Sequence, residues 1–594
     1  MVQEYLDAMP EELAELAFPA ASRRDVWDGL RPEKRDSIIR RGERFLGFDW
    51  PPLTCGDYLA FSRTGERARF EEKYNARRQA VCALAMAECA EHQSRFLDDL
   101  ADGLWLICEE SGWQLPAHNN YIRDTPPLPL PDPDRPVADL FACETAATLS
   151  LVRSLLGPEL ERTAPTLCRR IRTETDRRVI QPYLNTHFWW MGNGDEPMCN
   201  WTAWCTQNVL LTVFLSGCPQ AVRKAAARQA AYSLDCFLKD YGQDGCCEEG
   251  AVYYRRAGLC LWGALEVLDR VSGGAFAPLF QEEKVKNIAS YIVNVHAGGG
   301  WYLNYADCAP KAGPCGAQEY LFGCRTGDAA LRALACAGIS DPGPRDILWD
   351  ISLFVQLLDA LCDRGMSAAH RDIPAPAGVF YPSTGLWAAR DGTWCVSLRA
   401  GHNGCSHGHC DSGSLIVYRQ GRPMLIDVGV ESYTAKTFSP ERYSIWTMRS
   451  DWHNLPTVNG VVQGPGQGYA PTGVEHWDDG ARAGISLELA PAYPPEAGAF
   501  SYRRRAELAR GAGFTVEDCY QGDGEAVLSL LFCEVPVWRD GTLNAAGGGI
   551  RLSIQEAPKI EAVPISDSHL RECWPGTLYR VLIPVRDSLR MVFF

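Results

Sequence analysis

The stretch DIPAPAGVFYPSTG, residues 372–385, separates two parts of the chain that have different sequence patterns. Its prolines and glycines disfavour both helix and central strand, which is typical of a linker. Before it, apolar residues recur at helical spacing, and after it short alternating runs are bounded by turn residues. The sequence therefore predicts a helical domain over residues 1–372 and a β domain over residues 385–594.

The part before the linker consists of amphipathic segments joined by short loops. Long examples are RRQAVCALAMAECAEHQSRFLDDLADGLWLICEE and VADLFACETAATLSLVRSLLGPEL, and further helices are expected over 203–217, 221–239, 251–272, 281–296 and 346–364. The second of these segments is expected to begin near Asp134, with Pro136 in its first turn. This succession of helices and short loops predicts an (α/α) toroid or a helical solenoid.

The part after the linker reads as short strands. Examples are TWCVSLRA, GSLIVYRQGRPMLIDVG, GFTVEDCYQG and the terminal RMVFF. The centre of the second run, RQGRP, is a hairpin turn signal. The β domain is therefore predicted to be an antiparallel β-sandwich, and the whole chain a multidomain α+β protein.

The composition excludes some functions. The 594 residues carry a net charge of −16, which argues against a general nucleic-acid binder. An anionic ligand would then need a local cationic patch. The 24 cysteines include no zinc-ribbon pair and are expected to be reduced, buried thiols.

The sequence also gives an expectation about location. No run of about 18 apolar residues is evident, so no membrane span is expected. The N-terminal MVQEYLDAMPEELAEL has neither a basic start nor an apolar stretch. The protein is expected to be cytoplasmic, or secreted or periplasmic with its signal removed.

Two histidines lie one residue apart in CSHGHCDSGS, residues 405–414. If this stretch is a strand, Cys405, His407, His409 and Asp411 share one face. Asp427 ends the following hairpin, and His453 lies in RSDWHNLPTVNG. Two histidines and a carboxylate suit Zn²⁺ or Mn²⁺. The alternative is that both histidines are surface residues of a sheet.

The stretch from Gly401 to Tyr433, followed by RYSIWTMRSDWHNLPTVNG, resembles the central β domain of the heparinase II/III-like polysaccharide lyases. Within that superfamily it is similar to the broad-specificity glycosaminoglycan lyases of polysaccharide lyase family 35. Further similar motifs are WQLPAHNNYIRD, VADLFACETA, NWTAWC and DGCCEEGAVYYRRAG. The resemblance implies an N-terminal helical toroid followed by antiparallel sheets, the order predicted above.

The resemblance also implies an activity. Such lyases cleave 4-linked uronate polysaccharides by β-elimination and leave a 4,5-unsaturated product. Hyaluronan, chondroitin sulfate and heparan sulfate are the leading candidate substrates, and alginate remains open. The reaction must neutralise the uronate carboxylate, remove the C5 proton and protonate the oxygen that leaves C4.

The resemblance assigns these tasks to particular residues. Asn200 would neutralise the carboxylate, Tyr253 would act as the acid and His407 as the base. His409, Asp427 and His453 would bind one divalent ion, Zn²⁺ first and Mn²⁺ as the alternative. His118, Asn119, Arg255, Arg256 and Arg442 would contact the anionic polysaccharide.

Each assignment has a plainer alternative. Asn200 is also a favoured helix N-cap residue. Tyr254 competes with Tyr253, and His407 could be a metal ligand. Asp411 could orient a ring or bind the metal. Trp113 and Trp301 could stack on sugar rings or pack in the core.

Two other functions remain open at this point. Asp244, Glu248 and Glu249 could supply the paired carboxylates of a toroidal glycoside hydrolase. The chain could also be a carbohydrate-binding protein without activity. Only a lyase would form an unsaturated product, so ultraviolet absorbance separates these functions.

Overall fold

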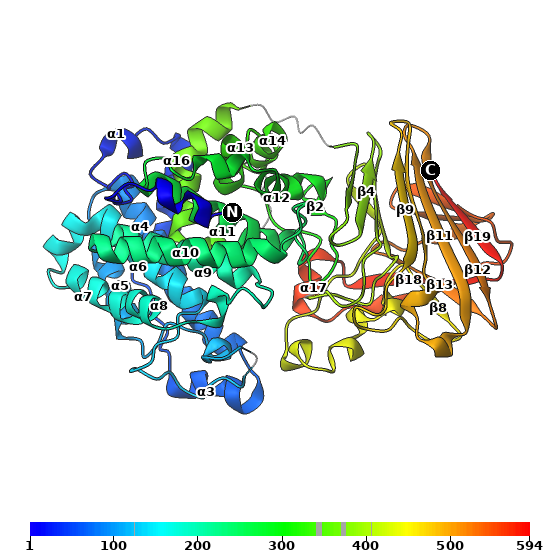
Figure 1. Ribbon diagram of the computed structural model, residues 1–594, viewed down its shortest axis with the longest axis horizontal. Coiled ribbons are helices and arrows are strands. Elements are labelled where there is room, and N and C mark those ends of the chain that lie inside the picture. Colours follow the sequence, from blue (N-terminus) through cyan, green and yellow to red (C-terminus); the bar gives the residue numbers. More distant parts are fainter. Residues whose placement is uncertain (124, 340–346, 370–375, 406) are drawn as a thin grey trace. The chain divides into compact units, whose positions relative to one another are not determined.

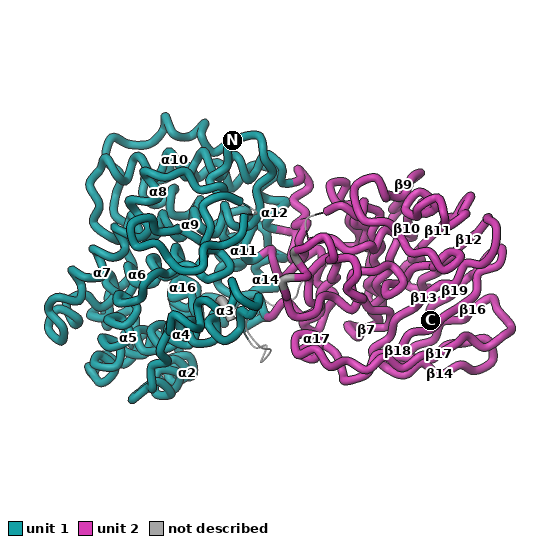
Figure 2. Tube along the Cα trace, turned by 90° about the horizontal axis from the view of Figure 1, so that it is seen from below, with its two compact units in different colours: residues 1–241, 255–289, 314–372 teal, residues 242–254, 290–313, 373–594 magenta. Residues whose placement is uncertain are grey.

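The computed structural model of the chain describes residues 1–123, 125–339, 347–369, 376–405 and 407–594. It divides into two compact units (Figure 2). The helical unit is formed by Met1–Tyr241, Arg255–Ala289 and Pro314–Asp372. The β unit is formed by Gly242–Tyr254, Ser290–Gly313 and Ile373–Phe594. The sequence suggested a single break in the chain, whereas two segments that precede residue 372 belong to the β unit.

The first part of the chain is helical, as predicted (Figure 1). Its α-helices are α1 Arg24–Trp27, α2 Pro32–Glu43, α3 Cys55–Thr64, α4 Ala68–Glu91, α5 Leu97–Glu109, α6 Leu140–Thr163, α7 Leu167–Thr175, α8 Gln181–Asn185, α9 Asn200–Leu215, α10 Gln220–Asp240, α11 Ala251–Val271, α12 Glu283–Asn294, α13 Ala317–Thr326, α14 Ala329–Gly338, α15 Ile347–Ile351 and α16 Leu353–Ala368. The segments expected over 203–217 and 221–239 are α9 and α10. The segment expected over 346–364 is two helices that are separated at Ser352.

The start of α6 differs from the prediction. Its N-cap is Asp139, whose side chain accepts a hydrogen bond of 2.7 Å from the backbone N–H of Ala142. The predicted start at Asp134 and Pro136 is therefore about one turn too early. An Asp that bonds the third backbone N–H of a helix satisfies a donor that would otherwise lack a partner, which explains why the helix begins here.

Helix α6 also corrects the expectation about apolar segments. Within the described residues it is long and apolar enough to span a membrane by length and composition alone. However, 78% of its apolar window is buried, and the helix packs against α9, itself almost entirely buried. Burial on all sides is what makes a core helix apolar all round.

The second part of the chain forms antiparallel sheets. Its strands are β3 Gly378–Tyr381, β4 Leu386–Arg390, β5 Trp394–Arg399, β6 Leu415–Arg419, β7 Arg422–Leu425, β8 Pro456–Val458, β9 Thr472–Asp478, β10 Arg482–Glu488, β11 Ala499–Ala509, β12 Gly513–Gly522, β13 Ala526–Phe532, β14 Val537–Arg539, β15 Thr542–Ala545, β16 Gly548–Leu552, β17 Lys559–Pro564, β18 Thr577–Val585 and β19 Ser588–Phe593. Every strand pairing in the described part of the chain is antiparallel, which confirms the predicted sheet type.

Three sheets build the β unit. One has the order β3-β4-β5-β6-β7, one the order β14-β15-β16-β19-β12-β11-β10-β9, and one the order β17-β18-β13-β8. Side chains from all three form one buried core, including Val396 of β5, Ile485 of β10 and Leu528 of β13. The inward-facing apolar positions of the alternating strands supply this core.

Several elements depart from the expected pattern. Strand β3 lies inside the predicted linker, whose residues 372–375 are outside the described ones. A short hairpin, β1 His296–Gly298 and β2 Trp301–Tyr302, precedes it in the β unit. A short helix, α17 Ser568–Cys573, lies between β17 and β18.

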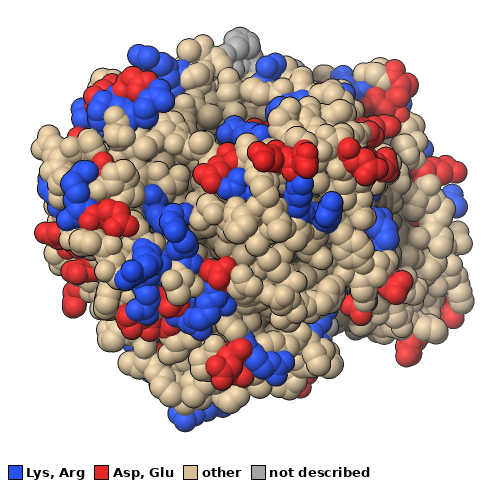
Figure 3. All heavy atoms as spheres, turned by 60° about the vertical axis from the view of Figure 1, so that its left-hand side comes forward, with Lys and Arg blue, Asp and Glu red and all other residues tan. Residues whose placement is uncertain are grey.

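The chemistry of the surface and of the thiols follows the composition. None of the 24 cysteines, all of them in described residues, forms a disulfide, as expected. On the face drawn in Figure 3, Lys and Arg side chains gather in patches with Asp and Glu between them. The net negative charge therefore does not prevent local cationic surfaces.

Candidate active site and metal centre

The histidine-bearing stretch is a loop and not a strand. β5 ends at Arg399 and β6 begins at Leu415, and His407 has a φ of 54°. A positive φ is uncommon for a residue with a side chain and is maintained only where the surroundings fix it. The prediction that alternate residues from Cys405 to Asp411 share a strand face is therefore wrong. Ser406 lies outside the described residues.

A single carboxylate brings the two histidines together. Asp307, which is fully buried, receives a hydrogen bond from His407 Nδ1 at 2.9 Å and one from His409 Nε2 at 3.0 Å. The backbone N–H of Asp307 also donates to the backbone oxygen of His407 at 3.1 Å. The sequence analysis missed Asp307 because no motif marks it and the histidines lie about 100 residues further along.

These bonds fix which nitrogen of each ring carries a proton. Burial opposes the charge of Asp307, but hydrogen bonds from both histidines and the nearby Arg442 hold its pKa well below the usual range. An ionised carboxylate can only accept, so His407 donates through Nδ1 and His409 through Nε2. His407 Nε2 and His409 Nδ1 are then the acceptor nitrogens.

His407 also lies beside a second carboxylate. Its Nε2 is 3.9 Å from Glu249 Oε2. Burial lowers the pKa of His407, whereas the bond to Asp307 and the charge of Glu249 raise it, and the result lies above the ordinary value. The ring is thus suited to take up a proton and to hold it.

Two tyrosines extend this group. The hydroxyls of Tyr253 and Tyr433 are 2.8 Å apart, and Tyr433 donates to Asp307 Oδ2 at 3.3 Å. Because the one proton of Tyr433 goes to Asp307, Tyr253 donates to Tyr433. The Tyr253 ring is 5.2 Å from the His407 ring. Burial raises the pKa of Tyr433 far above its usual value, so it stays protonated.

Tyr254 has a different environment from Tyr253. It is fully buried, and its ring lies 5.8 Å from that of Tyr291. The structure thus places Tyr253, and not Tyr254, next to His407. Tyr433 had been quoted within the β-domain motif, but no role was predicted for it.

Arg442 is engaged within the protein. Its guanidinium donates to Asp307 Oδ1 at 2.6 Å and to the backbone oxygens of His407, Gly408 and Thr437 at 3.0, 3.3 and 3.1 Å. These bonds hold the strained loop against Asp307. They differ from the predicted substrate contact, which would need an outward-facing guanidinium.

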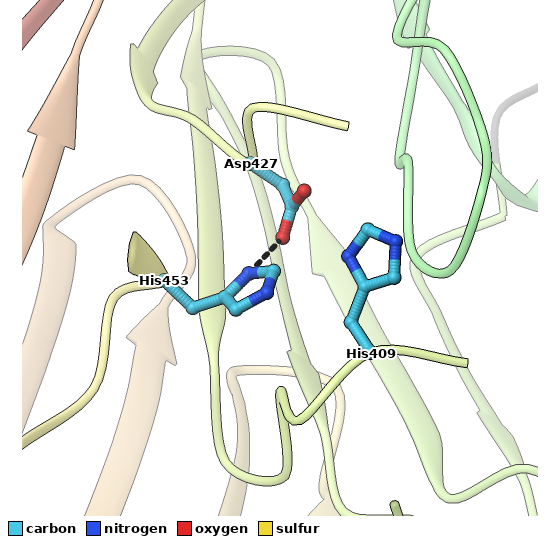
Figure 4. A group of neighbouring side chains, drawn as sticks. All are labelled: His409, Asp427 and His453. Carbon is cyan, nitrogen blue, oxygen red and sulfur yellow. Dashed lines mark hydrogen bonds and ion pairs between the residues drawn. The ribbon is translucent and has the colours of Figure 1, made fainter. Parts of the chain in front are cut away.

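The predicted metal ligands lie together. His409, Asp427 and His453 are buried, and their candidate ligand atoms lie within 4.8 Å of one another (Figure 4). His453 Nδ1 donates to Asp427 Oδ2 at 2.7 Å, and Gly429 N–H donates to Asp427 Oδ1 at 2.9 Å. Asp411 is not part of this group, because it pairs with Arg399.

The residues present fit a divalent ion. His409 Nδ1 and His453 Nε2 are both buried and have no hydrogen-bond partner, a costly state for a ring nitrogen unless something else binds it. A carboxylate that orients one ligating ring, and another that orients the second, are the usual supports of a metal site. Two imidazoles and a carboxylate are a donor set for zinc.

A buried ion pair supports this centre from below. Arg504 of β11 pairs with Asp518 of β12 at 2.7 Å, and both are fully buried. Arg504 Nη1 donates to the backbone oxygens of Gly413 and Asn454 at 2.7 and 2.8 Å. Gly413 ends the histidine loop and Asn454 follows His453, so one guanidinium ties together both segments that carry the imidazoles.

The candidates in the helical unit fall into two groups. Asn200 is the first residue of α9 and is buried, and Cys199 is the N-cap, so the capping alternative does not describe Asn200. The next residue, Trp201, packs edge-on against His118 at 4.6 Å. His118 Nδ1 hydrogen-bonds the N-cap carboxylate of Asp139 at 2.8 Å. These two candidates thus flank the same tryptophan.

The other candidates in that unit make internal contacts. Asn119 is fully buried, donates to Leu128 O at 2.9 Å and accepts from Gln114 at 3.0 Å, so it holds a loop and does not face a ligand. Arg255 donates to Pro314 O at 2.9 Å. Arg255 and Arg256 line a pocket. Trp113 is buried and Trp301 stacks on Trp574, so both pack within the protein.

The carboxylates proposed for a hydrolase do not form a pair. Asp244 accepts hydrogen bonds from Ser383 N and Oγ at 2.9 and 2.8 Å, which joins two loops. Glu248 is exposed and Glu249 is buried. Adjacent residues in such different environments cannot flank one sugar bond as the hydrolase mechanism requires.

Comparisons with known proteins agree with this architecture. Residues 373–560 match the family model described as Heparinase II/III-like, C-terminal. No curated protein sequence matches the chain. A crystal structure of heparinase III is similar with a TM-score of 0.61 and 12% identity, covering 96% of this chain and 93% of that one.

Two further solved structures are similar. A second heparinase III has a TM-score of 0.58 and 12% identity over 95% of this chain and 84% of that one. A heparan sulfate lyase mutant from Pedobacter heparinus has a TM-score of 0.55 and 14% identity over 100% of this chain and 87% of that one. The chain therefore has the fold of heparinase III and carries, at residues 373–560, a heparinase II/III-like C-terminal domain.

Proposed function

We propose that this protein is a polysaccharide lyase that cleaves 4-linked uronate-containing glycosaminoglycans by β-elimination. The observation that carries the proposal is the group around Asp307, which holds His407 with Nε2 as the acceptor nitrogen beside Tyr253. A base and a phenol in one group are the two proton-transfer partners that an elimination needs. The similar solved structures are titled heparinase III and heparan sulfate lyase.

The base in this proposal is His407. Its Nε2 takes the C5 proton of the uronate, and the proton stays because Asp307 and Glu249 stabilise the imidazolium. As the C5–H bond breaks, negative charge develops on the uronate carboxyl group. Asn200 is the proposed donor to that group, since an amide N–H donates without adding a buried charge.

The acid in this proposal is Tyr253. Its hydroxyl gives a proton to the oxygen that leaves C4, and the C4–O bond breaks as the C4–C5 double bond forms. Tyr433 can then turn its own O–H from Asp307 towards the Tyr253 oxygen, 2.8 Å away, and stabilise the phenolate. Transfer of the proton from His407 to Tyr253 through solvent restores the starting state.

The metal in this proposal is Zn²⁺, with Mn²⁺ as the alternative. His409 Nδ1, His453 Nε2 and Asp427 would hold it. When bound, the ion supplies a positive charge that fixes these three side chains in place. His409 also bonds Asp307, so the residues that hold the metal support the carboxylate that orients His407.

A panel of polymers tests the proposal. Hyaluronan, chondroitin sulfate, heparan sulfate and alginate are each incubated with the protein while ultraviolet absorbance is followed. The proposal expects absorbance to rise with at least one glycosaminoglycan, because elimination creates a conjugated double bond. New reducing ends without new absorbance would identify a hydrolase, and no product from any polymer would identify a binding protein.

A further inference from the structure

The helical unit contains a pocket that no assigned role uses. Helices α6, α9, α11, α13 and α16 surround it, and it measures about 700 Å³ including the space at its mouth. That size is within the range of small-molecule sites. Its lining includes Glu144, Trp204, Gln207, Arg256, Trp349 and Asp359.

Hydrogen bonds fix the two tryptophans of this pocket. Trp204 Nε1 donates to Glu144 Oε2 at 2.8 Å, and Trp349 Nε1 donates to Asp359 Oδ2 at 2.6 Å. Asn208 also donates to Glu144 at 2.8 Å, and burial raises the pKa of Glu144. Because each indole N–H is engaged, the tryptophans contribute ring surface to the pocket.

Gln207 leaves one polar requirement of the pocket unmet. It is only 3% exposed, and its Oε1 has no hydrogen-bond partner. A Cβ built on Gly263 would lie 2.0 Å from this oxygen, so the glycine makes room for the carboxamide. A buried acceptor without a partner is costly, and a ligand that brings an O–H or N–H group would satisfy it.

The charges of the pocket restrict the ligand further. Glu144, Glu319 and Asp359 face Arg255 and Arg256, so three carboxyl groups accompany two guanidinium groups. Glu319 lies 3.7 Å from Arg255, which leaves Arg256 as the better partner for one ligand carboxylate. A sulfate would add negative charge beside these acids and would be disfavoured.

We infer that this pocket binds one unsulfated sugar residue of the substrate. The tryptophan rings offer apolar surface to the sugar ring, Gln207 accepts from a hydroxyl, and Arg256 binds a single carboxylate. Asn200, Trp204 and Gln207 follow at i, i+4 and i+7 on α9, so the pocket lines the same helix face that begins with Asn200. The inference rests on the proposed function for naming a saccharide, and it adds a preference for low sulfation.

Binding measured without turnover tests this inference. In a Tyr253→Phe background, calorimetry compares unsulfated tetrasaccharides of chondroitin and heparan with their sulfated counterparts. We expect tighter binding of an unsulfated form, and a loss of about tenfold in its affinity when Gln207→Leu is added, the scale of one buried hydrogen bond. Gln229→Leu, on α10 and outside the pocket, is the matched control and should change nothing.

Each result has one meaning. Melting temperatures within a few degrees show that Gln207→Leu is folded, and if it is not, Trp349→Phe replaces it with the same expected loss. Equal affinity for sulfated forms, or unchanged affinity in the pocket variant, would overturn the inference while polymer cleavage could still stand. Unsulfated binding that depends on Gln207 without cleavage of any polymer would instead reject the lyase and keep the pocket.

Discussion

At the scale of single residues, the account depends on Asp307. One ionised carboxylate accepts from two imidazoles, and this sets the acceptor nitrogen of each ring. In Asp307→Asn, the amide has only one oxygen and adds N–H donors that face the rings. We expect activity to fall by roughly 10²-fold or more, the scale of acid–base catalysis, with the fold retained.

Rate measurements together with circular dichroism check this prediction. Asp244→Asn is the control, because Asp244 only joins two loops and should keep most of the activity. A near-normal rate in Asp307→Asn would show that the carboxylate does not orient His407.

The two adjacent tyrosines give a second prediction at this scale. Tyr253→Phe removes one hydroxyl beside Tyr433 and His407, so activity should fall roughly 10²-fold while the melting temperature is kept. Tyr254→Phe, in a fully buried position, should lower stability more than activity. The reverse order of rates would show that the wrong tyrosine was assigned.

At the scale of elements, the histidine loop and the strands beneath it form one structure. Arg504 carries hydrogen bonds to both segments that bear the imidazoles and pairs with Asp518 in the core. Arg504→Met leaves a buried carboxylate unpaired, so unfolding free energy should fall by about 3–5 kcal/mol. Arg505→Met, in an exposed pair with Glu507, should cost under about 1 kcal/mol in the same urea titration.

The metal centre is tested at the same scale. Its ligands come from the loop before β6, from the residues after β7 and from the turn before β8, so a bound ion would join three segments. His453→Ala should abolish stoichiometric zinc in elemental analysis and lower the melting temperature, because the ligands lose their link. Full zinc content in this variant would reject the ligand assignment.

The elements also show what sequence patterns can predict. The RQGRP turn gave the β6–β7 hairpin, with Gln420 and Gly421 at positive φ, and helical spacing located α9 and α10. Such local patterns depend on neighbours in the chain. The histidine loop does not, because contacts from Asp307 and Arg442 fix its shape and no period reveals them. The ligand set His409, Asp427 and His453 was found only through resemblance to a family.

At the scale of the whole molecule, the β unit is assembled from three separate parts of the chain. Two of them, Gly242–Tyr254 and Ser290–Gly313, contribute Tyr253 and Asp307. A reading that placed one boundary near residue 372 could not anticipate this, since the segments lie within a helical pattern. The group that the proposal treats as catalytic thus exists only in the folded unit and in no continuous stretch of sequence.

The central claim is that the polymer is broken by elimination, and the mass of the products tests it most directly. The glycosaminoglycan that the absorbance panel identifies is digested in water enriched in heavy oxygen, and the fragments are weighed by mass spectrometry. Elimination adds no water, so the account predicts that the fragments sum to the mass of the parent chain and carry no heavy oxygen. Fragments that together gain one water, with heavy oxygen incorporated, would contradict it.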